Sequence, residues 1–192
     1  LGNVRSLATT MSTQVAMIRY LDNNENKASS PNQNFARELM ELFLLGVGNY
    51  TEADVESSAA AWTGHTDQWD DEVSPYRWRA EWHDSRPKTY LGRTINTNAD
   101  PTAWSLHGPE TIEVVFGNGI VPAGADNVAN RGRATRDVAA EFLSRKLWNG
   151  FATTGVPPTD VLDSMRIALV TNDFDVRPWV TAMLTHPAFY TD

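Results

Sequence analysis

The chain has 192 residues, of which 41% are hydrophobic and 21% charged, the composition of a globular protein about one domain in size. Its formal net charge of −8 argues against nucleic acid as a partner, because no basic surplus is present to displace counterions. No apolar run approaches the roughly 18 residues of a membrane-spanning helix. Cysteine is absent, which excludes disulfides and thiol chemistry.

The N-terminal third of the sequence predicts helices. Apolar residues at steps of three and four indicate one long helix over residues 4–21, which the polar stretch DNNENKASSPN then interrupts. A second helix is expected over residues 33–45, with Gly46 as a left-handed cap. Thr51 and Asp54 have the spacing of a capping box and start a third helix.

The middle of the chain has a different pattern. SPYRWRAEW alternates strictly, with Tyr76, Trp78 and Trp82 on one face, and this period predicts a half-buried strand. HDSRP supplies turn residues, and KTYLG can return as a short partner strand. We therefore expect a hairpin inside an irregular segment over residues 64–102.

Helical patterns return in the C-terminal half, over residues 109–117, 133–150, 159–170 and 176–184, with Gly150 expected to end one of them. Glu141 and Arg145 have the i,i+4 spacing of an ion pair on the second of these helices. The predicted fold is mainly α: a compact multi-helix domain of six or seven helices with one small β-hairpin in the middle. We expect residues 1–192 to form a single helical domain.

A narrow polar stripe on the second helix is the first candidate site. Asn34, Arg37, Glu38 and Glu41 share one face of about 100°, while Phe35, Leu39, Leu42, Phe43 and other apolar residues cover the rest. The helix is therefore expected to be enclosed on most sides, with Arg37 and Glu41 paired at i,i+4. The stripe is either a structural ion-pair network or a pair of positioned carboxylates for acid–base work or cation binding.

The histidines give a second candidate. None of the four has a metal-ligand spacing, so neither a metal nor a cofactor is expected. His83 and Asp84, with Lys88, occupy the predicted hairpin turn, where they could bind an anion or assist proton transfer. The competing interpretation is a solvated polar turn.

Several separate motifs resemble the domain of unknown function 1800 family. They are AMIRYLDN, PNQNFARELMELFLLGVGNYTEADVESSAAAWTG, HDSRPKTYLG, FLSRKLW and HPAF, in this order. The central motif is similar to N-E-N-[FY]-A-R-E-L-x-E-L-[FH]-T-L-G. Gln33 and Leu44 depart from the family's Glu and Thr, and Phe43 stands where many members have His. The departures at Gln33 and Phe43 weigh against any metal mechanism that needs that Glu and that His.

The resemblance implies a bacterial, mainly helical protein, exported or envelope-associated, with an N-terminal helical portion that precedes these motifs. We carry two hypotheses. The first is a scaffold or interaction module, with that N-terminal portion and an envelope protein or polysaccharide as partners. The second is a hydrolase-type enzyme acting on an envelope polymer or carbohydrate, with Glu38, Glu41, His83 and Asp84 as catalytic residues and Asn34, Arg37 and Lys88 as binding residues. If the HDSRPK turn folds back onto the polar stripe of the second helix, the enzyme hypothesis is favoured.

Overall fold

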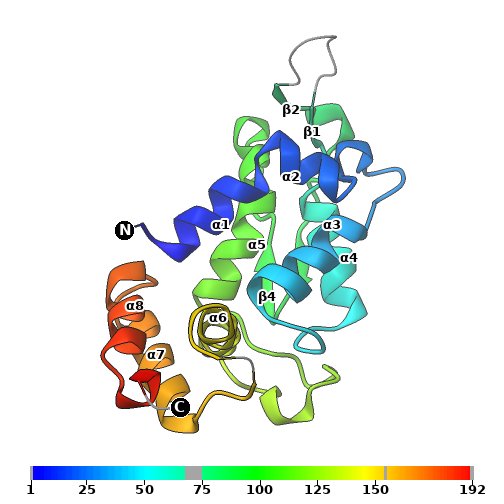
Figure 1. The fold of residues 1–192 in the computed structure, drawn as a ribbon. Coiled ribbons are helices and arrows are strands. Elements are labelled where there is room, and N and C mark those ends of the chain that lie inside the picture. Colours follow the sequence, from blue (N-terminus) through cyan, green and yellow to red (C-terminus); the bar gives the residue numbers. More distant parts are fainter. Residues whose placement is uncertain (1, 68–74, 154, 191–192) are drawn as a thin grey trace.

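The computed structural model describes residues 2–67, 75–153 and 155–190. Over these residues the fold is mainly α, as predicted, with eight α-helices where six or seven were expected (Figure 1). They are α1 (Val4–Ser12), α2 (Val15–Tyr20), α3 (Asn34–Glu38), α4 (Glu52–Ala61), α5 (His107–Phe116), α6 (Thr135–Phe151), α7 (Thr159–Thr171) and α8 (Val176–Leu184).

Helix α5 lies at the centre of the arrangement and packs against α1, α4 and α6 (Figure 1). Helices α6, α7 and α8 pack in succession beside it. The backbone N–H of Val4 donates to the carbonyl of Phe174 at 2.9 Å, so the start of α1 is tied to the connection between α7 and α8. The hydrophobic core contains large side chains from both halves of the chain, namely Phe35, Met40, Leu44, Trp62, Tyr90, Ile112, Phe116, Trp148 and Phe174.

The predicted long helix over residues 4–21 is in fact two helices. Gln14 has an extended backbone (φ −72°, ψ 136°) and separates α1 from α2. The hydroxyls of Thr9, Ser12 and Thr13 bond back to carbonyls three or four residues earlier, and such bonds bend helices. The prediction of one long helix was wrong because the apolar residues keep their helical spacing on both sides of Gln14. This spacing does not reveal a break that the side-chain hydroxyls favour.

The predicted helix over residues 33–45 is present, but its second half is a π-helix, η2 (Leu39–Leu44). Gly46 follows with φ +80°, the left-handed cap that the sequence predicted. Leu42 and Phe43 are 43% and 37% exposed, so the helix is not enclosed on most sides. The wider π turn changes the direction of these side chains, which a periodicity of 3.6 cannot predict.

Helix α4 begins with the predicted capping box. The Thr51 hydroxyl accepts from the Asp54 N–H at 3.3 Å, and the Asp54 carboxylate accepts from the Thr51 N–H at 2.8 Å. The other Asp54 oxygen accepts the N–H of Leu91 at 2.7 Å. Leu91 is fully buried with φ +46°, so Asp54 joins the start of α4 to a tight turn in the middle segment.

The middle segment contains two antiparallel strand pairs among the described residues, each with three residues per strand. Strands β1 (His65–Asp67) and β2 (Tyr76–Trp78) pair with His65 opposite Trp78, and β3 (Lys88–Tyr90) and β4 (Arg93–Ile95) form a hairpin. A hairpin is therefore present in the expected segment, but its predicted pairing is wrong, because KTY pairs with RTI and not with YRW.

The predicted strand over residues 76–82 is correct only for its first half. Its partner β1 begins at His65, directly after Gly64 with φ +86°, and the last backbone hydrogen bond on this side joins Arg79 to Gly64, so the pairing does not continue beyond Arg79. Residues 80–82 instead form a 3-10 turn, η3 (Ala80–Trp82). Trp78 and Trp82 are both half-buried, as the alternation suggested for the aromatic face.

In the C-terminal half, α6 passes through Gly150 and ends at Phe151, so that glycine is not the expected stop. The predicted i,i+4 pair of α6 is confirmed, with Arg145 and Glu141 at 2.9 Å. No helix in the described ranges is both long and apolar enough to cross a bilayer.

Candidate functional site

The polar stripe of α3 and η2 does not form the predicted pair. Arg37 binds Glu52 at the start of α4 through two hydrogen bonds of 2.8 and 2.7 Å, and not Glu41. The Glu52 carboxylate raises the pKa of Arg37, and the guanidinium lowers the pKa of Glu52. The arginine side chain is 32% exposed and that of the glutamate 71%, so this ion pair lies at the surface.

The other stripe residues have separate partners. Glu41 accepts a hydrogen bond from the Tyr50 hydroxyl. Burial, reinforced by this carboxylate, raises the pKa of Tyr50. Asn34 is exposed and donates to the carbonyl of Leu21 at 3.2 Å, while Glu38 is half-buried. Arg37, Glu41, Tyr50 and Glu52 line an open cleft of about 260 Å³.

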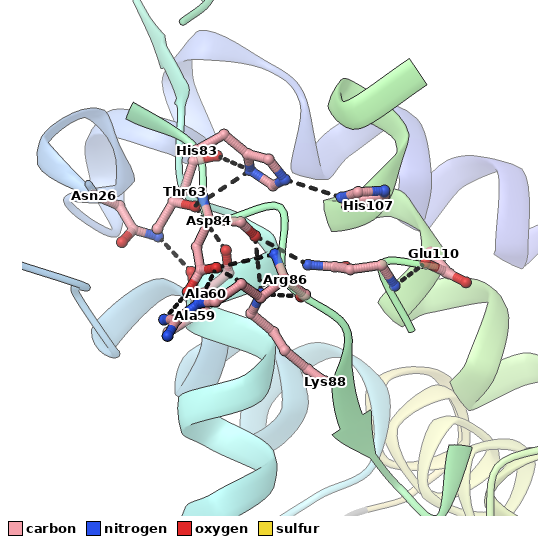
Figure 2. A network of polar contacts seen from close by, with 11 residues as sticks. Asn26, Ala59, Ala60, Thr63, His83, Asp84, Arg86, Lys88, His107 and Glu110 are labelled. Carbon is pink, nitrogen blue, oxygen red and sulfur yellow. Dashed lines mark hydrogen bonds and ion pairs between the residues drawn. The ribbon is translucent and has the colours of Figure 1, made fainter. Parts of the chain in front are cut away.

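The HDSRPK turn contains two buried charged side chains, Asp84 and Lys88, whereas the Arg86 side chain is 83% exposed. The solvated-turn interpretation is therefore wrong for Asp84 and Lys88. Only 6% of Asp84 is exposed, and its carboxylate accepts from the Arg86 side chain at 2.9 and 2.7 Å (Figure 2). Lys88 lies 3.3 Å from the same carboxylate and donates to the carbonyls of Asp84 and Arg86. Hydrogen bonds from Arg86 hold the pKa of Asp84 well below its usual range despite burial.

His83 links this turn to two other elements. Its Nδ1 lies 2.9 Å from the carbonyl of Thr63, just after α4, and its Nε2 lies 2.9 Å from Nδ1 of His107, the first residue of α5 (Figure 2). Burial lowers the pKa of His83 to about 4, so the ring is neutral at neutral pH. Because a carbonyl only accepts, Nδ1 carries the proton, and Nε2 must accept from Nδ1–H of His107.

Sequence reasoning missed three members of this network: Thr63, His65 and His107. The Thr63 hydroxyl accepts from the Asp84 N–H at 2.8 Å. His65 is fully buried against Trp62 and Trp78, with Nδ1 3.0 Å from the Tyr76 hydroxyl. Burial, followed by its neighbours His83 and His107, lowers the pKa of His65 to about 3. The only signal in the sequence was WTGH directly after a helix, which carries no recognised chemistry.

Arg37 and Glu41 of the stripe lie at the opposite end of α4 from the turn. Arg37 contacts Glu52, the first residue of α4, and Glu41 contacts Tyr50, just before it, whereas His83 and Asp84 contact Thr63, two residues beyond the last residue of α4. The ten residues of α4 span about 15 Å. Within the described ranges, no hydrogen bond or ion pair joins Arg37 or Glu41 to the turn. The structure thus brings His83, Asp84 and Lys88 together and keeps them apart from Arg37 and Glu41.

No three His, Asp or Glu side chains in the described part of the chain are placed to hold a metal ion. The fold and its polar centre define a mainly α protein in which a loop segment is held to the end of α4 and the start of α5 by buried hydrogen bonds of His83 and Asp84. The chain belongs to the family described as protein of unknown function (DUF1800), whose model matches residues 1–192. Neither a curated protein nor a solved structure matches it.

Proposed function

We propose that this chain is a helical scaffold or interaction module, and that a groove beside α1 receives an amphipathic helix from the N-terminal portion of the same protein. Bacterial origin, export and an envelope protein or polysaccharide as a further partner are part of this proposal. They come from the family resemblance.

The observation that carries the proposal is the groove itself. It has a volume of about 190 Å³ and is lined by Leu7 and Met11 of α1, Leu39 and Phe43 of η2, and Leu143 of α6, among others. Leu7 is 59% exposed and Met11 44%, so part of the apolar face of α1 is open. Contiguous exposed apolar side chains of this kind mark interaction surfaces, and a groove between helices suits a helix with apolar residues on one face.

The polar candidates support the same proposal. Arg37, Glu41 and Asp84 are each bonded to other side chains of the chain. A neutral His83 with a pKa of about 4 is poorly matched to proton transfer near neutral pH. The hydrolase alternative needs the carboxylates of the stripe and the turn to act on one substrate. Glu41 lies near the start of α4 and the turn near its end, so this separation does not support the alternative.

Single cysteines test the proposal, because the native chain has none. Met11→Cys places a thiol in the groove, and Ile167→Cys, at a residue 51% exposed on α7, is its matched control. In the whole protein under native conditions, we expect the cysteine at position 11 to react with a soluble maleimide at least about tenfold more slowly than the control, with equal rates in denaturant. Equal native rates would show that the groove is open and would overturn the proposal.

A further inference from the structure

A cleft of about 360 Å³ lies between the turn that follows η2 and the middle of α6. Its lining comes from residues 45–49, from residues 127 and 130, and from one face of α6. This size is within the usual range of small-molecule sites, about 300–1,000 Å³. Among the described residues, none lines both this cleft and the groove beside α1, so the cleft is independent of the proposed docking site.

The segment that forms two sides of the cleft is basic, although the chain as a whole is acidic. Residues 127–146 contain five arginine and lysine residues against two aspartate and glutamate residues, whereas the whole chain has 16 against 24. A basic region in an acidic chain concentrates positive potential at one place on the surface. The cleft is therefore a place where an anion is attracted to a protein that otherwise repels it.

Two guanidinium groups share one carboxylate at this cleft. Glu141 accepts from Arg133 at 3.1 Å and from Arg145 at 2.9 Å. Burial disfavours the ionised carboxylate, but these hydrogen bonds lower the pKa of Glu141, so it is charged at neutral pH. The nearby Asp126 lines the separate cleft of Arg37 and does not line this one. Among the described residues at this cleft, one positive charge is thus left unbalanced.

Arg145 is the guanidinium that a ligand can reach. Its side chain is 42% exposed and lines the cleft, and its one hydrogen bond among the described residues goes to Glu141. Since a guanidinium has five N–H donors, most of those of Arg145 are open to a ligand. Arg133 is more committed, because it also donates to the side chain of Asn130.

The polar floor of the cleft is fixed by the protein itself. Asn49 is 5% exposed, donates to the carbonyl of Leu45 at 2.9 Å and accepts from the Asn130 side chain at 2.7 Å. Asn127 also lines the cleft, and within the described ranges its side chain has no hydrogen bond, so its amide can donate to a ligand. A floor that is already ordered reduces the entropy lost on binding.

We propose that this cleft binds a small organic carboxylate, whose charged end lies between Arg145 and Asn127. A guanidinium is a rigid, planar set of donors that suits a planar carboxylate. One negative charge matches the single unbalanced positive charge, whereas a phosphate monoester carries about −1.5 to −2 at neutral pH. Leu45, Val138 and Phe142 form an apolar wall for the rest of the ligand.

Hydrocinnamate is a suitable probe, because it joins a carboxylate to a short apolar body. Its amide and 3-phenylpropylamine are the neutral and cationic analogues, and phenyl phosphate is the phosphate analogue. In NMR titrations at neutral pH, we expect hydrocinnamate to shift the backbone amides of Val47, Asn127 and Arg145 saturably, with a Kd of about 1 mM or below. The amide and the amine should bind at least about tenfold more weakly, because they lack the negative charge.

Three variants locate the site. Arg145→Gln removes the positive charge from the cleft and should weaken hydrocinnamate binding at least about tenfold. Lys146→Gln removes the same charge from the next residue, which is exposed and does not line the cleft, and should leave binding within about threefold. Asn127→Phe fills the cleft without altering the guanidinium and should abolish binding, which keeps the test valid if Arg145→Gln fails to fold.

Four results would overturn the proposal. The first is the lack of a saturable shift with hydrocinnamate. The second is equal binding of hydrocinnamate and its amide, which would make the cleft merely apolar. The third is tighter binding of phenyl phosphate than of hydrocinnamate, which would assign the cleft to phosphate esters. The fourth is an equal effect of Arg145→Gln and Lys146→Gln, which would mean that the anion responds to the general charge of α6 and not to this cleft.

Discussion

Arg37 binds Glu52 at the protein surface through both of its terminal nitrogens. Exposed ion pairs stabilise a fold only slightly, because water screens the charges in the folded state and solvates them after unfolding. We expect Arg37→Leu to change the midpoint of urea unfolding no more than ordinary surface substitutions do, and Glu52→Gln to behave alike. A large fall for Arg37→Leu would instead support the buried network that the stripe suggested.

Asp84 has the opposite setting, because only 6% of its side chain and 9% of that of Lys88 are exposed. Asp84→Ala leaves a buried ammonium without its carboxylate, a change that typically costs about 3–5 kcal/mol. We expect a loss of this size in urea unfolding at neutral pH, and a smaller loss for Asp84→Asn, which keeps an acceptor for Arg86. If Asp84→Ala changes the free energy of unfolding by under about 0.5 kcal/mol, the turn is solvated after all.

At the scale of elements, Asp54 joins α4 to the β3–β4 hairpin. Asp54→Ala removes the carboxylate half of the capping box, which accepts the N–H of Thr51, and leaves the N–H of Leu91 buried without an acceptor. Losing half of the box costs about 0.5–2 kcal/mol and an unpaired buried N–H about 1–3 kcal/mol, so we expect about 1.5–5 kcal/mol in total. Thr51→Ala removes only the hydroxyl half, which accepts the N–H of Asp54, and should cost about 1 kcal/mol. Equal losses in thermal unfolding would mean that the contact to Leu91 contributes nothing.

The elements that could be predicted are those fixed by local patterns. The capping box of α4, the left-handed Gly46 and the i,i+4 pair in α6 each depend on residues within four positions, and all are confirmed. The break at Gln14 and the end of β2 at Trp78 depend on competing hydroxyl bonds and on where a partner strand begins. Apolar periodicity carries neither kind of information.

The candidate site was predicted in part for the same reason. The HDSRPK motif identified His83, Asp84 and Lys88 as neighbours, because they are close in sequence. Their burial depends on Thr63 and His107, which lie about twenty residues before and after His83. Helical periodicity predicted which residues of the stripe share a face. It could not predict what they bind, since Glu52 lies fifteen residues from Arg37. Contacts at this separation depend on how whole elements pack.

At the scale of the molecule, the histidines connect parts of the fold that share no secondary structure. His65 belongs to β1, His83 follows η3 and His107 begins α5, and their rings stack with tryptophans from β2 and η4. A neutral imidazole suits such a centre, because it accepts and donates hydrogen bonds without the cost of burying a charge. The cohesion of the middle segment with α5 therefore depends on keeping these rings unprotonated.

This dependence predicts a loss of stability in mild acid. Burial lowers the pKa of His65 to about 3 and of His83 to about 4, against 6.5 for a free histidine, and lowers that of His107 as well. As the pH falls below 6.5, the unfolded chain binds protons that the folded chain does not, so folding becomes less favourable. The histidine contribution is complete above pH 6.5 and is lost progressively down to the folded pKa values. Asp84, whose pKa is also lowered, contributes stability that is lost only below pH 3.8.

Each such histidine contributes a slope of about 1.4 kcal/mol per pH unit, so His65 and His83 together should give about 3 kcal/mol per unit near pH 5. Urea unfolding at several pH values between about 7 and 5 measures this slope. His83→Gln keeps hydrogen-bonding groups but does not titrate, so its slope should be smaller by about 1.4 kcal/mol per unit. Stability that stays constant across this range, or an unchanged slope in the variant, would mean that His83 is protonated or solvated in the folded protein.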